Sequence, residues 1–153
     1  MMTRANAREL AVHLIYAREF TGDEPEMVIA TRMEKEYYSQ LAVENPVYED
    51  LPNRVQRAYI DSVVVGVANR INQLNEIIGK FSIDWDISRI SRLTRTVLQL
   101  AIFEILYVDD VPTGVAISEA VRIVKLYDTE EAGAFVNGIL GSFARSLVTE
   151  VET

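Results

Sequence analysis

The sequence predicts an all-α protein, a single bundle of six or seven helices. Apolar residues recur at helical spacing along the whole chain, and no stretch shows the strict alternation of apolar and polar residues that indicates a half-buried strand. The chain has 153 residues, and it contains no repeat, low-complexity tract or linker that would divide it. A chain of this length folds as one domain by default, so we expect a single helical domain over 1–153.

The first two helices are predicted on either side of a short break. In residues 4–20 the apolar residues fall on one helix face: Ala7, Leu10, Ala11, Leu14 and Ile15. Gly22 favours a helix end, and Pro25 favours a first helical turn behind an Asp23 cap. A second helix is therefore expected over about 25–44.

The middle of the chain is predicted to form one long helix and one buried helix. A steady apolar stripe runs over 52–78, and Gly79 ends it. After a short link, in which Asp86 or Ser88 is a candidate cap, the segment 87–107 has only Gln99 and Glu104 as polar residues in its second half. A helix that is apolar nearly all round is buried, so we expect this segment at the centre of the fold.

Two further helices are predicted in the C-terminal part of the chain. A turn at 109–112 precedes a helix over 115–127. Asp128, with Glu131 three residues later, has the spacing of a capping box and marks the start of the last helix.

The composition excludes several classes of protein. The chain has no Cys, which rules out disulfides and Cys-based zinc sites, and no apolar run approaches the ~20 residues that span a bilayer. The N-terminus lacks the apolar core of a signal peptide, so a cytoplasmic protein is expected. The one histidine, His13, lies away from the apolar face and is expected to be solvated. No recognisable catalytic constellation is present, so we expect no catalytic residue, metal or cofactor.

The net charge limits how the protein binds nucleic acid. Fifteen Lys and Arg face 23 Asp and Glu, which gives a net charge of −8. Cationic side chains drive binding to nucleic acid because they displace the counterions condensed on phosphates. Any RNA binding must therefore use a local basic patch or a basic partner.

Several blocks of sequence, taken in order, resemble the NusB family over about 4–146. The blocks are Asn6-Ala7-Arg8-Glu9-Leu10-Ala11-Val12 followed by Tyr16, then the segment 95–105, then Asp110-Val111-Pro112, Val115-Ala116-Ile117-Ser118-Glu119-Ala120-Val121, Lys125-Leu126-Tyr127 and Phe135-Val136-Asn137-Gly138-Ile139-Leu140. The resemblance implies a bundle of two packed subdomains, with an N-terminal helical half at about 4–79 and a C-terminal half at about 85–149.

The resemblance also implies a function. Members of the family bind the boxA element of nascent RNA together with NusE, a small-subunit ribosomal protein. The pair helps to assemble a complex with other Nus factors that keeps RNA polymerase from terminating, especially on ribosomal RNA operons. The function implied is transcription antitermination by binding alone.

Three arginines are candidates for the RNA contact. Arg4 and Arg8 lie about 40° apart around the first helix, and Arg18 returns to about 40° on the other side of Arg4. The three guanidiniums would line one edge and contact phosphates bidentately. The alternative is that they are scattered surface charges. The resemblance places the family's arginine-rich RNA surface on this helix.

Phe135 and Glu104 each have two interpretations. Phe135, near the start of the last helix, would either stack on an RNA base or fill the core. Glu104 lies in an apolar helix, and a buried carboxylate must be paired or hydrogen-bonded, so an internal salt bridge competes with a partner contact. The resemblance places the NusE surface along this helix and the following one, which carries Glu119 and Arg122.

The first helix carries fewer arginines than the family's pattern has at this edge. Asn6 stands where the family's pattern has Arg, so we expect weak RNA affinity for the isolated protein and a strong dependence on the basic NusE. Two other functions compete with this one. In the first, the chain is a protein-binding or self-associating module, such as a homodimer, that has lost RNA binding. In the second, it is a stand-alone relative of the RNA-binding domain of a ribosomal RNA methyltransferase.

Overall fold

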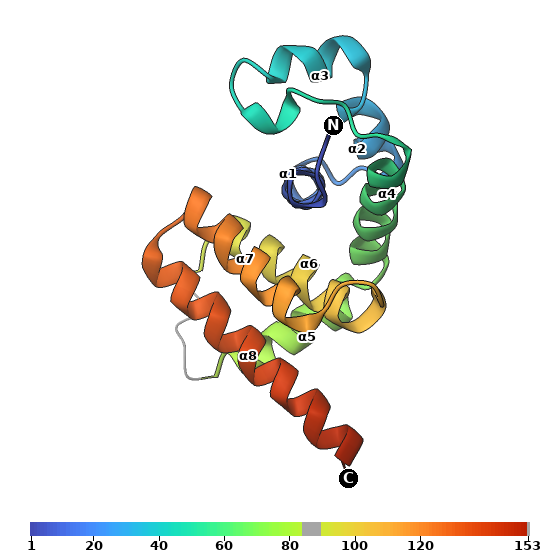
Figure 1. Cartoon of the computed structure of the whole chain (residues 1–153). Helices are drawn as coiled ribbons and strands as arrows, with labels where there is room; N and C mark the ends of the chain where they lie inside the picture. Colours follow the sequence, from blue (N-terminus) through green and yellow to red (C-terminus); the bar gives the residue numbers. More distant parts are fainter. Residues whose placement is uncertain (84–89, 153) are drawn as a thin grey trace. The chain divides into compact units, whose positions relative to one another are not determined.

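A computed structural model describes residues 1–83 and 90–152 (Figure 1). In this part of the chain there are eight α-helices and one 3-10 helix, and no strand, which confirms the predicted all-α fold. The elements are α1 (Arg4–Thr21), α2 (Pro25–Arg32), α3 (Lys35–Leu41), η1 (Pro46–Tyr48), α4 (Arg54–Asn69), α5 (Ile71–Phe81), α6 (Arg92–Tyr107), α7 (Thr113–Tyr127) and α8 (Glu130–Glu152).

The chain divides into two compact units, a first unit of Met1–Asn69 and a second unit of Arg70–Thr153. The division falls inside the segment 52–78, for which the prediction of a single helix was wrong. At Arg70 the backbone leaves the helical conformation, with φ −119° and ψ 19°, so that α4 belongs to the first unit and α5 to the second. Apolar residues continue at helical spacing across this point, which is why the interruption left no mark in the pattern.

The first unit is built around α1, which contacts α2, α4 and η1. Thr3 caps the start of this helix by accepting a hydrogen bond from the amide of Asn6, and Gly22 ends it in the left-handed conformation with φ 69°. In Figure 1, α1 is seen along its axis with α4 beside it. The predicted apolar face of α1 is buried, and Leu10 and Leu14 have no exposed surface.

The predicted second helix is in fact two. α2 ends at Arg32, and α3 begins at Lys35 behind a new cap, Glu34, whose carboxylate accepts hydrogen bonds from the amides of Tyr37 and Glu36. These bonds to the ionised form lower the pKa of Glu34. A carboxylate in this position also interacts favourably with the helix dipole, so the short α3 has its own start signal.

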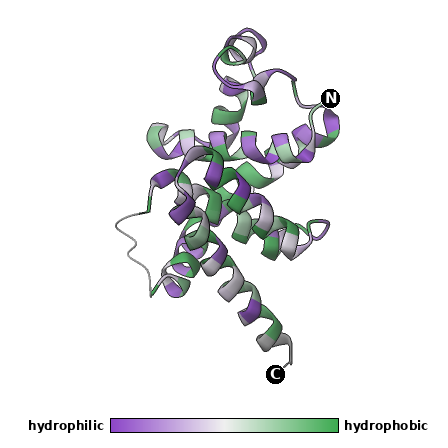
Figure 2. Ribbon diagram, turned by 60° about the vertical axis from the view of Figure 1, so that its left-hand side comes forward, coloured by the Kyte–Doolittle hydropathy of each residue, from purple (hydrophilic) through white to green (hydrophobic). Residues whose placement is uncertain are grey.

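The second unit has α6 at its centre, in contact with α5, α7 and α8. Every residue of α6 from Thr96 to Glu104 is buried, which agrees with the prediction of a helix without a solvent face. Figure 2 shows hydrophobic and hydrophilic residues mixed along the helices, as expected where a helix turns one face toward a core. The candidate caps Asp86 and Ser88 lie outside the described residues, and α6 is capped by Ser91, which accepts a hydrogen bond from the amide of Thr94.

The corner between α7 and α8 differs from the predicted capping box. Thr129, not Asp128, caps α8, since its hydroxyl oxygen accepts a hydrogen bond from the amide of Ala132 at 3.1 Å. Asp128 instead binds the start of α6, where it accepts hydrogen bonds from the hydroxyls of Ser91 at 2.6 Å and Thr94 at 2.8 Å. One carboxylate therefore ties the end of α7 to the beginning of α6.

Two properties of the described residues bear on function. None of the helices found there combines the length and the apolar character that crossing a membrane requires. Within residues 1–83 and 90–152, no group of three or more His, Asp or Glu side chains is arranged to hold a metal ion.

Candidate RNA interface

The three predicted arginines of α1 differ in how much of their surface is accessible. Arg4 is half-buried at the first residue of the helix, whereas Arg8, one turn later, is 4% exposed. Arg18 lies in the last turn of α1, and its Nε is buried with no hydrogen-bond partner among the described residues. Arg4 is therefore the member of the predicted edge that is best placed to meet a phosphate directly.

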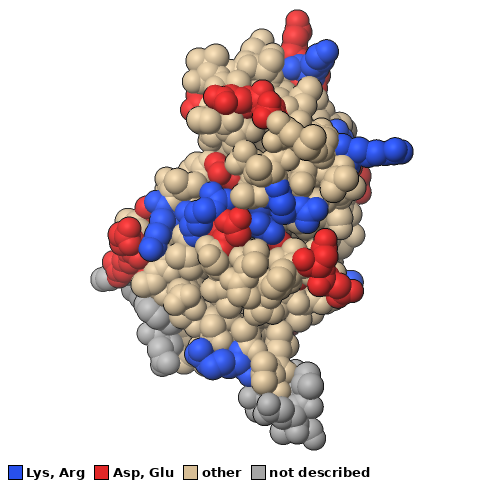
Figure 3. Space-filling view, in the orientation of Figure 1, with Lys and Arg blue, Asp and Glu red and all other residues tan. Residues whose placement is uncertain are grey.

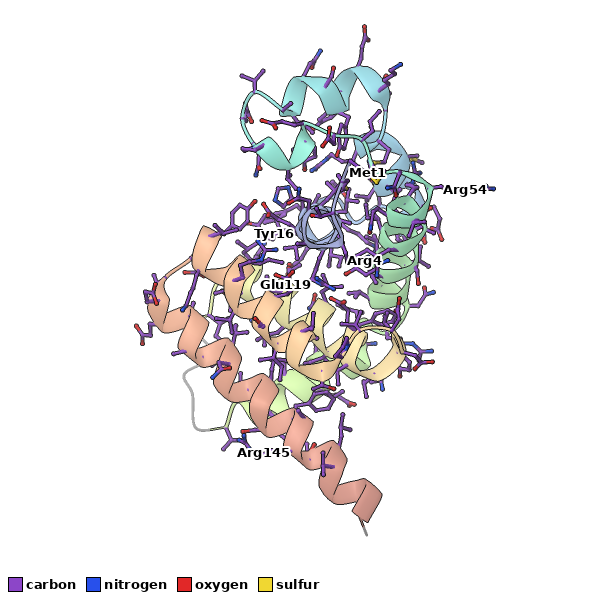
Figure 4. The ribbon with its side chains drawn as sticks, in the orientation of Figure 1. Met1, Arg4, Tyr16, Arg54, Glu119 and Arg145 are labelled. Carbon is purple, nitrogen blue, oxygen red and sulfur yellow. The ribbon has the colours of Figure 1, made fainter. Side chains whose placement is uncertain are left out.

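The guanidinium of Arg4 is held by two residues of α4. Its Nε donates a hydrogen bond of 2.8 Å to Oε1 of Gln56, and its central carbon lies 4.2 Å from the centre of the Tyr59 ring. Figure 4 shows Arg4 lying between α1 and α4. The ring of Tyr59 attracts the positive charge of Arg4 through its quadrupole. Neither Gln56 nor Tyr59 is among the site residues predicted from the sequence.

Arg8 approaches the same aromatic ring from further away. Its guanidinium carbon lies 5.8 Å from the centre of the Tyr59 ring, and the ring itself is 6% exposed. Because Arg8 has so little accessible surface, it does not present its fork of donors to solvent. Of the three arginines predicted to bind phosphates along one edge of α1, Arg8 is therefore the one least accessible to RNA.

Helix α4 carries two further arginines on its first turns. Arg54 is exposed, and its side chain points away from the ribbon (Figure 4). Figure 3, in the same orientation, shows Lys and Arg in blue among Asp and Glu in red on this face. Arg57 forms an ion pair with Asp61 one turn later, with 3.0 Å between Nε and Oδ1. The start of this helix is capped by Asn53, whose side-chain oxygen accepts a hydrogen bond from the amide of Gln56. This cap fixes the first turn of α4, and with it the backbone of the residue that binds Arg4.

The other predicted RNA residue, Phe135, is a buried residue of α8. It is 6% exposed, so its ring offers almost no surface on which a base could stack. Of the two interpretations that the sequence left open, the geometry favours packing. The small residues before it belong to the first turn of α8, and Gly133 lies there against the aliphatic chain of Lys125 from α7.

The predicted partner-binding residues fall into two groups. Glu104 is 1% exposed in α6, so of its two interpretations the burial favours an internal contact over a partner contact. Glu119 and Arg122 lie on α7 and form an ion pair with each other, three residues apart, in which Nε of the arginine donates to Oε2 of the glutamate. Of the three, this pair retains exposed side-chain surface.

His13 is half-buried and hydrogen-bonded, whereas the prediction was a solvated side chain. Its Nδ1 lies 2.8 Å from the hydroxyl of Tyr48, and that hydroxyl also accepts a hydrogen bond of 2.6 Å from Arg32. Burial and the nearby positive charge of Arg32 lower the pKa of His13 from 6.5 to about 4. The residue is thus a neutral member of a hydrogen-bonded group that joins α1, α2 and η1.

Comparison with known proteins gives one consistent family. Residues 5–145 match the model of the NusB family. The chain is 40% identical over 144 residues to the transcription antitermination protein NusB of Acetivibrio thermocellus, covering 94% of this chain and 90% of the relative. It is 36% identical over 148 residues to the NusB protein of Sorangium cellulosum, covering 96% of this chain and 95% of the relative.

Solved structures resemble most of the chain as well. A structure of T. maritima NusB superposes with a TM-score of 0.76 at 26% identity, covering 94% of this chain and 92% of that one. A crystal structure of the antitermination factors NusB and NusE in complex with dsRNA superposes with a TM-score of 0.70 at 24% identity, covering 94% of this chain and 96% of that one. The second likeness is one of fold.

Proposed function

The chain belongs to the NusB family, and from this premise we propose that it is a transcription antitermination factor that binds boxA-type RNA of nascent transcripts together with NusE. The observation that carries the proposal is the 40% identity to a transcription antitermination protein over 94% of the chain. We further propose that the protein acts in the cytoplasm by binding alone, without catalysis. RNA polymerase and other Nus factors would be indirect partners.

The surface charges support a composite mode of binding. The chain carries a net charge of −8, and of the three arginines predicted on α1 only Arg4 and part of Arg18 are accessible. Few phosphate contacts give weak binding, and each contact raises the salt dependence by a fixed increment. A basic partner such as NusE would supply the missing cations, and simultaneous binding would then strengthen the contacts of both proteins.

A second candidate function has its own support. The burial of Arg8, together with the acidic composition, favours a self-associating or protein-binding module with little affinity for RNA. A homodimer would be the simplest form of such a module. The two functions differ in one measurable property, which is RNA binding in the presence of NusE.

We predict that NusE increases the affinity of this protein for RNA by about tenfold or more, because each ligand contributes to the other's binding surface. The measurement is a titration of boxA-containing RNA into the protein, with and without NusE, at two salt concentrations.

Arg4→Gln should weaken the ternary complex by up to about tenfold and reduce the slope of log affinity against log salt by about 0.7, the value for one contact to single-stranded nucleic acid. Arg145→Gln, the same change of charge at an exposed position on α8 (Figure 4), is the matched control and should leave both quantities unchanged.

Absence of RNA binding under all four conditions would overturn the proposal in favour of the second candidate. Sedimentation of the protein alone would then distinguish a self-associating module from a monomer. Tight RNA binding that gains nothing from NusE would contradict the composite surface.

A further inference from the structure

We propose that Tyr59 and Gln56 are positioning residues, which fix the guanidinium of Arg4 in one orientation before an RNA phosphate arrives. This inference rests on the proposed function and deepens it, since it assigns residues of α4 to the RNA site on α1. Neither residue touches the phosphate itself. Both would act through Arg4.

The two contacts restrain the guanidinium in different directions. The hydrogen bond from Nε to Gln56 lies in the plane of the group and sets its rotation, with a length of 2.8 Å. The centre of the Tyr59 ring lies 4.2 Å from the guanidinium carbon, a cation–π distance, and attracts the group toward the ring. A guanidinium held both by a hydrogen bond and by an aromatic ring retains little freedom.

The contacts with Gln56 and Tyr59 leave the terminal NH₂ groups of Arg4 available to a phosphate. A guanidinium has five N–H donors in a rigid fork, and the hydrogen bond to Gln56 uses the one on Nε. Within the part of the chain that the structure describes, no other hydrogen bond to the Arg4 guanidinium is found. The two terminal NH₂ groups can therefore bind two oxygens of one phosphate.

The residues that hold Arg4 are themselves fixed. Gln56 and Tyr59 are three residues apart and so lie on one face of α4, which packs against α1. Tyr59 is 6% exposed, and Arg8 lies within 5.8 Å of the same ring. The ring therefore has no room to swing away from Arg4 in the unbound protein.

Prior fixation matters because binding immobilises the arginine that makes the contact. Ordering a flexible side chain costs between about twofold and about tenfold in affinity. A chain with a net charge of −8 gains little from long-range attraction to RNA. The geometry of each contact then decides more of the affinity than the number of cations does.

The test is a double-mutant cycle between Arg4 and the residues that hold it, with RNA affinity measured in the presence of NusE. We expect Tyr59→Leu to weaken RNA binding by between about threefold and about tenfold when Arg4 is present, and to have no effect in the Arg4→Gln background. Tyr59→Phe keeps the aromatic face and should retain the affinity of the unaltered protein. Gln56→Leu, a change at a half-buried position that is milder for folding, should show the same loss and the same dependence on Arg4.

Salt dependence separates positioning from charge. Tyr59→Leu leaves the arginine cation in place, so the salt slope should not change, whereas Arg4→Gln reduces it by about 0.7. Arg4→Lys keeps the charge without the fork or the stacking. It should lower the affinity nearly as much as Arg4→Gln while retaining the slope.

Two kinds of failure are distinguishable. If Tyr59→Leu and Gln56→Leu weaken binding equally with Arg4 present and in the Arg4→Gln background, or not at all, the positioning role is wrong while RNA binding stands. If the unaltered protein binds no RNA with or without NusE, the proposed function fails and the inference fails with it.

Discussion

Acidification from pH 7 to pH 4 is expected to lower the free energy of unfolding by about 3 kcal/mol through His13 alone. The pKa of this residue is 6.5 in its ordinary state and about 4 in the folded protein. Each unit of difference corresponds to about 1.4 kcal/mol, so the difference of 2.5 units between the two values gives the expected loss. This is the largest dependence on pH that we expect from a single site below neutral pH.

The sign follows from which state binds the proton first. As the pH falls below 6.5, His13 in the unfolded chain becomes protonated while the folded protein keeps it neutral. The unfolded state then binds more protons, and stability decreases with falling pH. The loss levels off as the pH falls through about 4, where the folded protein also takes up the proton. Above pH 6.5 the contribution is fully present.

The hydrogen bonds around His13 explain why protonation is resisted. When Nδ1 of His13 carries no proton, the hydroxyl of Tyr48 can donate a hydrogen bond to it while accepting one from Arg32. Burial raises the pKa of Tyr48, which keeps that hydrogen in place. A proton on Nδ1 would face the tyrosine hydrogen and would stand near a second positive charge on Arg32.

The measurement is a set of urea unfolding curves between pH 7 and pH 4 for the unaltered protein and for His13→Gln. The variant should show a shallower dependence on pH, because the carboxylates titrate in both proteins and only the histidine differs. His13 is the one histidine of the chain, so its proton resonance can also be followed without assignment. A folded-state pKa close to 6.5 would contradict the interpretation.

The fold class and the central position of α6 could be predicted because they depend on local periodicity. The helix divisions could not. Between α4 and α5 the chain turns at Arg70, a residue with no helix-breaking signal, while the apolar stripe continues on both sides. Between α2 and α3 the signal was present in Glu34, an acidic residue followed by its own helix, but acidic residues are so frequent in this chain that the cap did not stand out.

The candidate site was predicted in part for a related reason. Arg4 could be placed on an edge of α1 from its position alone, but the contacts that give it a function come from α4, and no local pattern pairs these two helices. For the other predicted site residues, the sequence did not reveal how deeply each side chain is buried. Phe135, Glu104 and Arg8 all lie under other parts of the fold, which the periodicity of a single helix does not reveal. His13 was misplaced because η1, a short element without periodicity, covers it.

Asp128→Ala is expected to lower the free energy of unfolding by about 2 kcal/mol at pH 7, the second of the two largest effects. The carboxylate accepts hydrogen bonds from Ser91 and Thr94 on one oxygen and from the amide of Thr129 on the other, at 2.6, 2.8 and 2.9 Å. These bonds, with that from Ser91 foremost, lower its pKa, so the carboxylate is ionised throughout the neutral range. Hydrogen bonds to a charged acceptor are stronger than neutral ones.

The size of the effect depends on what the substitution leaves behind. Thr94 is 1% exposed, so without Asp128 its hydroxyl loses a buried acceptor that water cannot readily replace. Asp128→Asn keeps an acceptor oxygen without the charge and should cost about half as much. Asp109→Ala, at an exposed turn position in the same unit, is the matched control and should change stability by less than about 0.5 kcal/mol.

Equal losses for Asp128→Ala and Asp109→Ala in urea unfolding would show that the corner is not held by this carboxylate. A difference between them would show that α6, the helix around which the second unit is built, depends at its first turn on a residue 34 positions away in the sequence.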